Sequence, residues 1–202
     1  LGDAFAPGVT IPAGVSLAGG ANADLITAGD LDLVALAPRV SGFETARIEA
    51  AAGEVAEVRL SGASLATFER LELVGSGVVA VALADDDFAF DDPLGDPARP
   101  FPIDISGLAD RPNPQDGARA GVGGRPESRL AGVTFALPEG GGTFLGSFAS
   151  GLGVEIFGSA SADVIIGGGG SDVIRPGLGA DRIGGGPDDV GDRFDIESAI
   201  GD

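Results

Sequence analysis

Three aspartates recur at one fixed spacing in the last quarter of the sequence. Asp163, Asp172 and Asp181 lie nine residues apart, and the residues before each of them are rich in Gly, Ser and Ala. Carboxylates are among the oxygen ligands that hard divalent cations prefer. Two residues after each aspartate stands a large apolar side chain, in turn Ile165, Ile174 and Ile183. These fixed positions indicate a structural repeat rather than a flexible glycine linker.

The spacing matches the nonapeptide G-G-x-G-x-D-x-U-x, in which U is a large apolar residue. The segment from Gly158 to Asp195 therefore resembles the calcium-binding β-roll of RTX (repeats-in-toxin) proteins. The resemblance implies that the first six residues of each repeat form a turn and the last three form a short strand. Glycines at positions one, two and four permit backbone conformations that are closed to other residues. The implied cofactor is Ca²⁺, bound by aspartates at position six and by backbone carbonyls.

One full coil of such a roll takes two nonapeptides, so aspartates on the same side are eighteen residues apart. The resemblance implies that Asp163 and Asp181 share one ion, which carbonyls of the turn glycines between 167 and 170 complete. Ser159 and Ser161 replace two glycines of the first repeat, which is therefore expected to be a half-formed cap.

The opposite side of the roll has a less regular spacing. Asp172 has Val190 at the matching position instead of an acid. Two residues inserted after Gly186 would bring Asp192 to position six and Phe194 to the apolar position. The second site therefore depends on this insertion.

A further copy of the motif occurs near the beginning of the sequence, from Gly19 to Thr27. It matches the nonapeptide if Asn22 stands for the fourth glycine, and Asn tolerates positive φ. Asp24 then occupies position six, although the flanking residues do not repeat the motif. The full set of candidate calcium ligands is Asp24, Asp163, Asp172, Asp181, Asp192, Gly167, Gly168, Gly170, Gly177 and Gly179. The residues expected in the core are Ile26, Ile165, Ile174, Ile183 and Phe194.

Between these two regions the chain repeats at a longer period. The segment 43–48 resembles 68–73 at an offset of 25, and 58–60 resembles 81–83 at an offset of 23. A period in the twenties is the size of one solenoid coil. Residues 55–60 alternate apolar and polar side chains, as in a strand with one buried face. We predict parallel strands here, no long helix, and one helical turn within residues 64–70.

Residues 85–129 interrupt this rhythm with seven prolines, which break regular strand ladders. We predict a linker or long loop with one strand at 101–105. The aspartates at 85–87, 91 and 92 are expected in a solvated loop, and Asp92-Pro93 and Asp96-Pro97 in turns rather than at self-cleavage sites. The expected parts are an N-terminal β-solenoid at 1–91, a linker at 92–130 and a C-terminal solenoid at 131–202. The fold class is all-β, a parallel β-solenoid (β-roll or β-helix) with calcium-binding turns and a Pro-rich interruption.

The composition excludes several classes of function. The 202 residues carry a net charge of −19, which repels nucleic acid and anionic lipid and attracts divalent cations. The sequence has no Cys and no His, so thiolate metal sites, disulfides, the usual zinc sites and Ser-His chemistry are excluded. The 44% of apolar residues can fill a core, although that core is thin, with 11 Phe and no Trp, Tyr or Met. No apolar run is long enough for a membrane helix, so no membrane insertion is expected.

Two classes of function remain after this exclusion. The first is a non-catalytic, calcium-stabilised solenoid of a secreted or cell-surface bacterial protein, acting in an adhesin, matrix, surface layer or filament. Its expected partners are calcium ions, other copies of the chain, and surface proteins or glycans. The second is the accessory region of a secreted enzyme whose catalytic domain lies elsewhere.

Neither the localisation nor a catalytic role is visible as a direct sequence signal. The resemblance implies type I secretion, but only eight residues follow Phe194, where the family carries its signal. Acid pairs such as Glu69 and Glu72 could mimic those of pectinase-like β-helix enzymes. They lie on an alternating strand whose outward positions are normally solvated, so no catalytic residue is assigned and no enzyme activity is expected.

Overall fold

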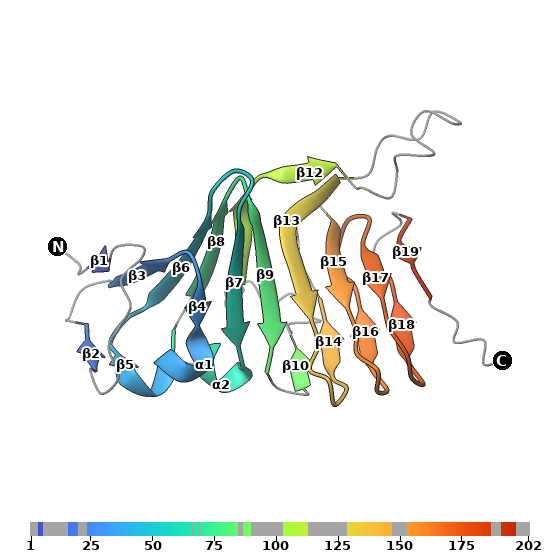
Figure 1. Cartoon of the computed structure of the whole chain (residues 1–202), viewed down its shortest axis with the longest axis horizontal. Helices are drawn as coiled ribbons and strands as arrows, with labels where there is room; N and C mark the ends of the chain where they lie inside the picture. Colours follow the sequence, from blue (N-terminus) through green and yellow to red (C-terminus); the bar gives the residue numbers. More distant parts are fainter. Residues whose placement is uncertain are drawn as a thin grey trace.

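In a computed structural model, the protein is a parallel β-solenoid (Figure 1). The structure describes residues 4–5, 16–19, 24–65, 67–68, 70–84, 87–89, 103–112, 129–146, 153–186 and 191–196. All described strands that pair with a neighbour do so in parallel, except β12 with β13, which are antiparallel. The predicted fold class is therefore confirmed.

One sheet, which we call the long sheet, runs the length of the molecule. Its strands, in spatial order, are β4 (Leu31–Asp32), β7 (Val55–Leu60), β9 (Val78–Leu83), β13 (Arg129–Ala136), β15 (Gly153–Phe157), β17 (Val173–Arg175) and β19 (Arg193–Phe194). The antiparallel strand β12 (Asp110–Pro112) adds to β13. This sheet joins the early and late coils of the chain into one structure.

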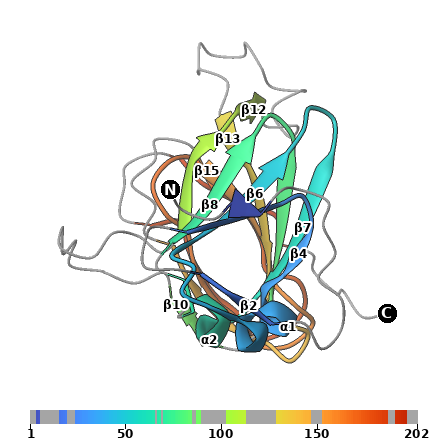
Figure 2. The ribbon, with the colours of Figure 1, turned by 90° about the vertical axis from the view of Figure 1, so that its left-hand side faces the viewer.

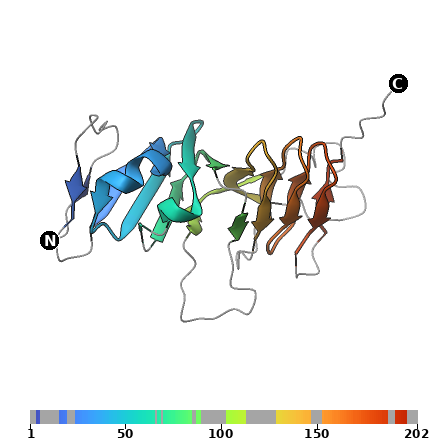
Figure 3. The ribbon, with the colours of Figure 1, turned by 90° about the horizontal axis from the view of Figure 1, so that it is seen from below.

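Two shorter sheets provide the other strands of the coils. The N-terminal sheet contains β1 (Ala4–Phe5), β3 (Leu25–Ala28), β6 (Thr45–Ala50), β8 (Arg70–Gly75) and β11 (Ile103–Leu108). The C-terminal sheet contains β10 (Asp87–Ala89), β14 (Thr143–Leu145), β16 (Val164–Ile166) and β18 (Arg182–Gly184). Strands β2 (Leu17–Ala18) and β5 (Val40–Ser41) form a separate pair. In the end-on view the coils lie one behind another (Figure 2), and from below they follow one another along the axis (Figure 3).

The longer sequence period is the step from one coil to the next. Ala46 pairs with Leu71 at the predicted offset of 25, and Val58 pairs with Val81 at the predicted offset of 23. In β7 the alternate residues Ala56, Val58 and Leu60 are buried and those between them are exposed. The period-two pattern therefore identified which face of each strand packs inward.

The core is one continuous cluster along the axis. It includes Ile48, Leu71, Leu73 and Val79, each 0% exposed. Two aromatic rings pack where the N-terminal sheet gives way to the C-terminal sheet. Phe135 of β13 and Phe144 of β14 are both fully buried, with ring centroids 5.1 Å apart.

The helical pieces are short, as predicted. They are α1 (Leu33–Leu36), the 3-10 helix η1 (Ala37–Arg39) and α2 (Gly62–Leu65). The helical turn predicted within 64–70 begins earlier because Ser61 caps it: Ser64 N–H donates to Ser61 Oγ (3.0 Å) and Ser61 N–H donates to Ser64 Oγ (2.8 Å). This reciprocal pair acts as a capping box. Within the described residues, no helix has the length and apolar character needed to cross a bilayer.

The prediction of one strand within residues 85–129 is wrong, because this Pro-rich segment contributes β10, β11 and β12 to the sheets, and Asp87, expected in a loop, begins β10. Strand β11 extends the N-terminal sheet beside β8, near the strand predicted at 101–105. Strand β12 pairs with β13 of the long sheet. Residues 90–102, which contain Asp92-Pro93 and Asp96-Pro97, lie outside the described residues, as does the strand predicted at 9–11. The division into three parts stays a prediction.

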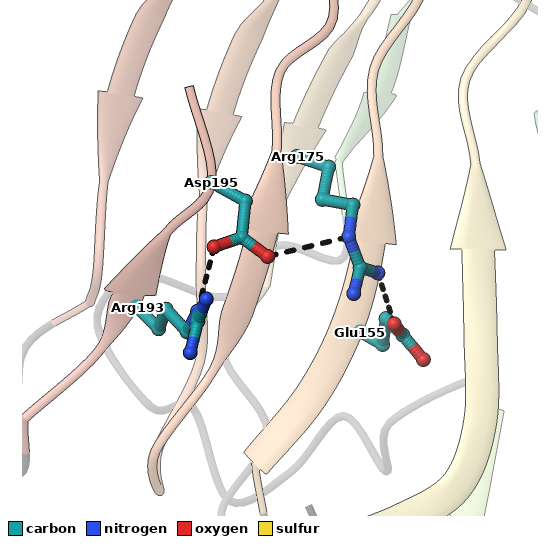
Figure 4. A network of polar contacts seen from close by, with 4 residues as sticks. All are labelled: Glu155, Arg175, Arg193 and Asp195. Carbon is teal, nitrogen blue, oxygen red and sulfur yellow. Dashed lines mark hydrogen bonds and ion pairs between the residues drawn. The ribbon is translucent and has the colours of Figure 1, made fainter. Parts of the chain in front are cut away.

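A network of charged side chains connects three coils on the outer face of the long sheet (Figure 4). Arg175 of β17 donates to Glu155 of β15 and pairs with Asp195 Oδ2 at 3.4 Å. Arg193 Nε donates to Asp195 Oδ1 at 2.6 Å. The Arg175 guanidinium also lies 5.0 Å from the centre of the Phe157 ring. These contacts attach the last described coil to the coils before it.

Candidate metal centre

Two stacks of turns lie at opposite edges of the C-terminal coils. In the first stack, residues 158–163 join β15 to β16 and residues 176–181 join β17 to β18. In the second stack, residues 167–172 join β16 to β17, and the connection from 185 to 192 joins β18 to β19. Residues 187–190 of that connection lie outside the described residues. As predicted, the strand of each regular repeat is its last three residues.

Asp163 is the central acidic residue of the first stack. Its side chain is buried, with 1% exposed. Oδ2 accepts the Ser159 N–H (2.7 Å) and hydroxyl (3.0 Å), and Oδ1 accepts Gly142 N–H (2.7 Å). Burial of a carboxylate is costly unless such bonds compensate it. Asp163 therefore joins its own turn to the coil before it.

Asp181 repeats this arrangement one coil later. Its Oδ1 accepts the N–H of Asp163 at 3.0 Å. The next residue, Arg182, donates its N–H to the Asp163 carbonyl at 2.8 Å. The structure thus brings Asp163 and Asp181 together in one stack, as the sequence spacing predicted.

Asp172 is the equivalent residue of the second stack, and it is also buried. Oδ2 accepts Gly168 N–H (2.8 Å) and Oδ1 accepts Val154 N–H (2.8 Å). A methyl group added at Gly167 would lie closer than 3.0 Å to Asp172 Oδ2. Gly167 and Gly168 therefore lie with Asp172. Sequence reasoning had associated their carbonyls with Asp163 and Asp181, but successive turns of a coil fall at opposite edges.

The irregular connection after Gly186 restores the repeat. Asp172 N–H donates to Asp192 Oδ1 at 3.0 Å, and Arg193 N–H donates to the Asp172 carbonyl at 2.8 Å. Strand β19 pairs Phe194 with Ile174, which is the register that the two-residue insertion predicts. Asp192 therefore occupies the place in the second stack that Asp181 occupies in the first.

The prediction that Phe194 belongs to the core is wrong for the described part of the chain. Ile26, Ile165 and Ile174 are buried, and Ile183 packs against the core while only partly buried. Phe194 is 39% exposed. The reason is its position on the last described coil, because no described strand covers its outer side.

Glycines in the turns bring oxygen atoms close together. Gly177 and Gly179 adopt φ of +84° and +130°, and Gly170 adopts +92°. A methyl group at Gly179 would lie closer than 3.0 Å to the Ser161 carbonyl and at 3.0 Å from Asp181 Oδ1. One point in the turn is thus flanked by a carbonyl of one coil and a carboxylate of the next.

Alanine substitutions at three glycines are expected to separate the cost of positive-φ strain from the cost of a clash between stacked turns. Gly53→Ala introduces only positive-φ strain (φ +80°, nothing within 4 Å) and should lower the free energy of unfolding by about 1–2 kcal/mol. Gly177→Ala adds a clash with the Ser159 carbonyl and should cost about 1–3 kcal/mol more. Gly29→Ala has neither problem and should change stability by less than about 0.5 kcal/mol. Urea unfolding of the three variants measures these values, and equal costs for Gly177 and Gly53 would contradict the close stacking.

In the N-terminal copy of the motif, Asp24 makes contacts between coils like those of Asp163, while residues 20–23, with Asn22 among them, lie outside the described residues. Asp24 is 2% exposed, and its N–H donates to Glu44 Oε2 (2.6 Å) on the next coil. Thr45 N–H donates to the Asp24 carbonyl at 3.2 Å, as Arg182 N–H does to Asp163. A methyl group at Gly19 would lie closer than 3.0 Å to Asp24 Oδ2 and to the Gly42 carbonyl.

Sequence reasoning did not identify Glu44 as part of this turn. The signal was present, because Glu44 directly precedes β6 as Asp24 precedes β3, twenty residues earlier. The search for a nine-residue period missed it, since the coils here are longer than eighteen residues. Glutamate in place of aspartate also departs from the motif.

The groups in these turns fit calcium. They are carboxylate and carbonyl oxygens, which Ca²⁺ prefers in sets of six to eight. Among the described residues, no three Asp or Glu side chains gather into one metal-binding group. Carbonyls therefore have to supply a large share of the ligands, which the close stacking of turns permits. The arrangement defines a parallel β-solenoid with oxygen-lined turns whose chemistry suits calcium.

Comparison with known proteins identifies the C-terminal segment. Residues 155–183 match the RTX calcium-binding nonapeptide repeat model, whose description gives four copies. This segment is an RTX repeat region, and repeats of this family bind Ca²⁺, which confirms both the predicted resemblance and the predicted cofactor. No curated protein and no solved structure matches the chain. Asp24 and Asp192 lie outside the matched residues.

Proposed function

We propose that Asp163 with Asp181, and Asp172 with Asp192, hold calcium ions between successive turns of the two stacks. Turn carbonyls complete the ligand sets, with Gly167, Gly168 and Gly170 in the second stack and Gly177 and Gly179 in the first. Each carboxylate has about four lone-pair sites, so it accommodates an ion beside its backbone hydrogen bonds. The bound ion supplies positive charge that offsets repulsion between stacked carboxylates. The single observation that carries this proposal is the repeated oxygen-lined geometry of the turns.

Asp24 and Glu44 are proposed to form a further calcium turn near the N-terminal end. The support is geometric equivalence. The Asp24 N–H donates to an acidic side chain of the next coil, as do Asp163 and Asp172. A calcium ion between Asp24 and Glu44 would stabilise N-terminal coils that lie outside the family match at residues 155–183.

Calcium in these turns is proposed to stabilise the fold rather than to take part in a reaction. An RTX repeat β-solenoid is a non-catalytic calcium-binding fold. Glu72 Oε2 accepts from Arg47 Nε (2.8 Å) and Nη2 (2.6 Å), and Glu72 Oε1 lies 3.3 Å from Arg70 Nε. Both carboxylate oxygens of Glu72 thus contact arginines on the outer face of the N-terminal sheet, which supports a structural role for that face.

The chain is proposed to act as a calcium-stabilised structural region of a secreted or cell-surface bacterial protein, such as an adhesin, matrix, surface-layer or filament component. RTX repeat proteins typically leave the cell by type I secretion, and extracellular calcium would fill such turns. The intact mass of the native polypeptide tests the alternative, because an attached catalytic domain would make this chain an accessory region of an enzyme.

Calcium titration of the full 202-residue chain tests the proposed role. Calorimetry should detect saturable binding, and the melting temperature followed by circular dichroism should rise with calcium, because the ion binds the folded state preferentially. Magnesium at the same concentration should raise it less, since Mg²⁺ demands near-ideal octahedral geometry and keeps its waters. Absence of binding heat together with an unchanged melting temperature would remove the proposal.

The same calorimetric titration tests the N-terminal turn in the variant Asp24→Asn. Loss of one bound ion relative to the unaltered chain would support a site at Asp24, and an unchanged stoichiometry would exclude it.

A further inference from the structure

Strand β19 is attached to the solenoid with little burial of apolar surface. Both of its residues are exposed, and the Phe194 side chain is 39% exposed. It pairs with β17 over two residues, whereas β18 pairs with β16 over three, and the connection into β19 is two residues longer than the turn 176–181. Exposed strands with few buried contacts open at a low cost in free energy. Asp192, directly before β19, is therefore held less firmly by the backbone than Asp181, directly before β18.

Charged side chains hold the other end of β19 (Figure 4). The register of β19 with β17, carried one residue further, places Asp195 opposite Arg175, and Asp195 Oδ2 lies 3.4 Å from Arg175 Nε. Asp195 Oδ1 accepts from Arg193 Nε at 2.6 Å. Arg175 is itself fixed by its hydrogen bond to the buried Glu155. The Asp195 carboxylate therefore attaches β19 to a guanidinium that the neighbouring strands already hold in place.

The calcium turn and the charged network act on the same strand. Asp192 directly precedes β19 and Asp195 directly follows it. Without a cation between them, the like charges of Asp172 and Asp192 repel and favour separation of β19 from β17. The contacts of Asp195 oppose that separation, so they raise the fraction of molecules in which both acids of the second stack lie together. Apparent affinity falls in proportion to the fraction of protein that is competent to bind.

The first stack has no counterpart of this network within the described residues. Its acids, Asp163 and Asp181, precede β16 and β18, and no ion pair between described residues joins these two strands. Its longer ladder and its regular six-residue turn position the acids instead. The first stack is thus an internal control for any effect that the network has on the second.

We propose that Asp195 is a positioning residue for the calcium site between Asp172 and Asp192. Its contacts with Arg175 and Arg193 hold β19 against β17, and this attachment sets the affinity of the second stack for calcium. The inference rests on the proposed calcium-binding function, because it concerns one of the proposed sites. The coupling is reciprocal, so calcium in the second stack also strengthens the attachment of Asp195 to the network.

Calorimetric titration of the full chain with calcium, in two backgrounds, tests this coupling. Asp181→Asn disables the first stack and leaves the second, and Asp192→Asn does the reverse. Both backgrounds also carry Asp24→Asn, so that the N-terminal turn does not contribute. Adding Asp195→Ala should raise the dissociation constant of the second stack by about threefold or more, because a network of ion pairs is lost. The dissociation constant of the first stack should change by less than about threefold.

The other outcomes separate this inference from the proposed function. A second stack that changes by less than about threefold, or equal weakening of both stacks, would overturn the positioning role and leave the calcium sites intact. If neither Asp181→Asn nor Asp192→Asn loses an ion relative to the unaltered chain, the proposed sites themselves are wrong. Glu54→Ala removes an exposed carboxylate from the turn between β6 and β7 and should leave both constants unchanged. If Asp195→Ala fails to fold, Arg193→Gln, which removes one of the two arginine contacts, should still weaken the second stack alone.

Discussion

Asp163→Asn is expected to remove calcium-dependent stability that aspartate provides at this position. One ion contributes about 2.7 kcal/mol when free calcium is 100 times its dissociation constant, and loss of a carboxylate ligand should eliminate most of that contribution. The variant also has a cost without calcium. Asparagine offers one acceptor oxygen where Asp163 uses two, so Gly142 N–H or the Ser159 donors lose their partner, at about 1–3 kcal/mol. Urea unfolding with calcium and with a chelator separates the two losses.

Glu139→Gln is the matched control for this measurement. Glu139 is exposed and lies in the connection between β13 and β14, so the variant loses the same charge without losing a buried contact. Its stability should change by less than about 0.5 kcal/mol in both solutions. If Asp163→Asn loses the same free energy with and without calcium, Asp163 serves only as a hydrogen-bond acceptor, and its assignment as a ligand is wrong.

The fold was largely predictable because a solenoid repeats its own sequence signals. Alternation in 55–60 identified the inward residues of β7, and the offsets of 25 and 23 gave the registers of β6 with β8 and of β7 with β9. The start of α2 was not predictable from apolar spacing, since reciprocal bonds between Ser61 and Ser64 determine it. Strands β11 and β12 show that proline marks where ladders are interrupted without excluding strands between the prolines.

The candidate site was predictable in its acidic residues and less so in its neighbours. The nine-residue spacing located Asp163, Asp172 and Asp181, and the insertion placed Phe194 opposite Ile174. The sequence could not assign each glycine to a stack without the course of the coil in space. Glu44 was missed for the same reason, because its relation to Asp24 depends on coil length rather than on a fixed motif.

Phe135→Ala is expected to weaken the junction between the early and the late coils more than any other part of the molecule. Phe135 is 0% exposed and packs on Phe144, where β10 and β14 of the C-terminal sheet succeed the strands of the N-terminal sheet. Truncation of a buried phenylalanine costs about 3–5 kcal/mol, because the cavity it leaves is only partly refilled.

The location of this loss should also change how the protein unfolds. In a repeat architecture each coil contacts only its neighbours, so a weak junction separates the cooperative units on its two sides. Calorimetry of Phe135→Ala should show two transitions, of which the one from the RTX repeats rises most with calcium. Phe43→Ala removes a similarly buried ring within the early coils, 6% exposed, and should lower stability without splitting the transition at this junction. The long sheet passes this junction without interruption from β9 to β13. If Phe135→Ala unfolds in a single transition that shifts as a whole with calcium, the long sheet alone keeps the two halves coupled, and the prediction is wrong.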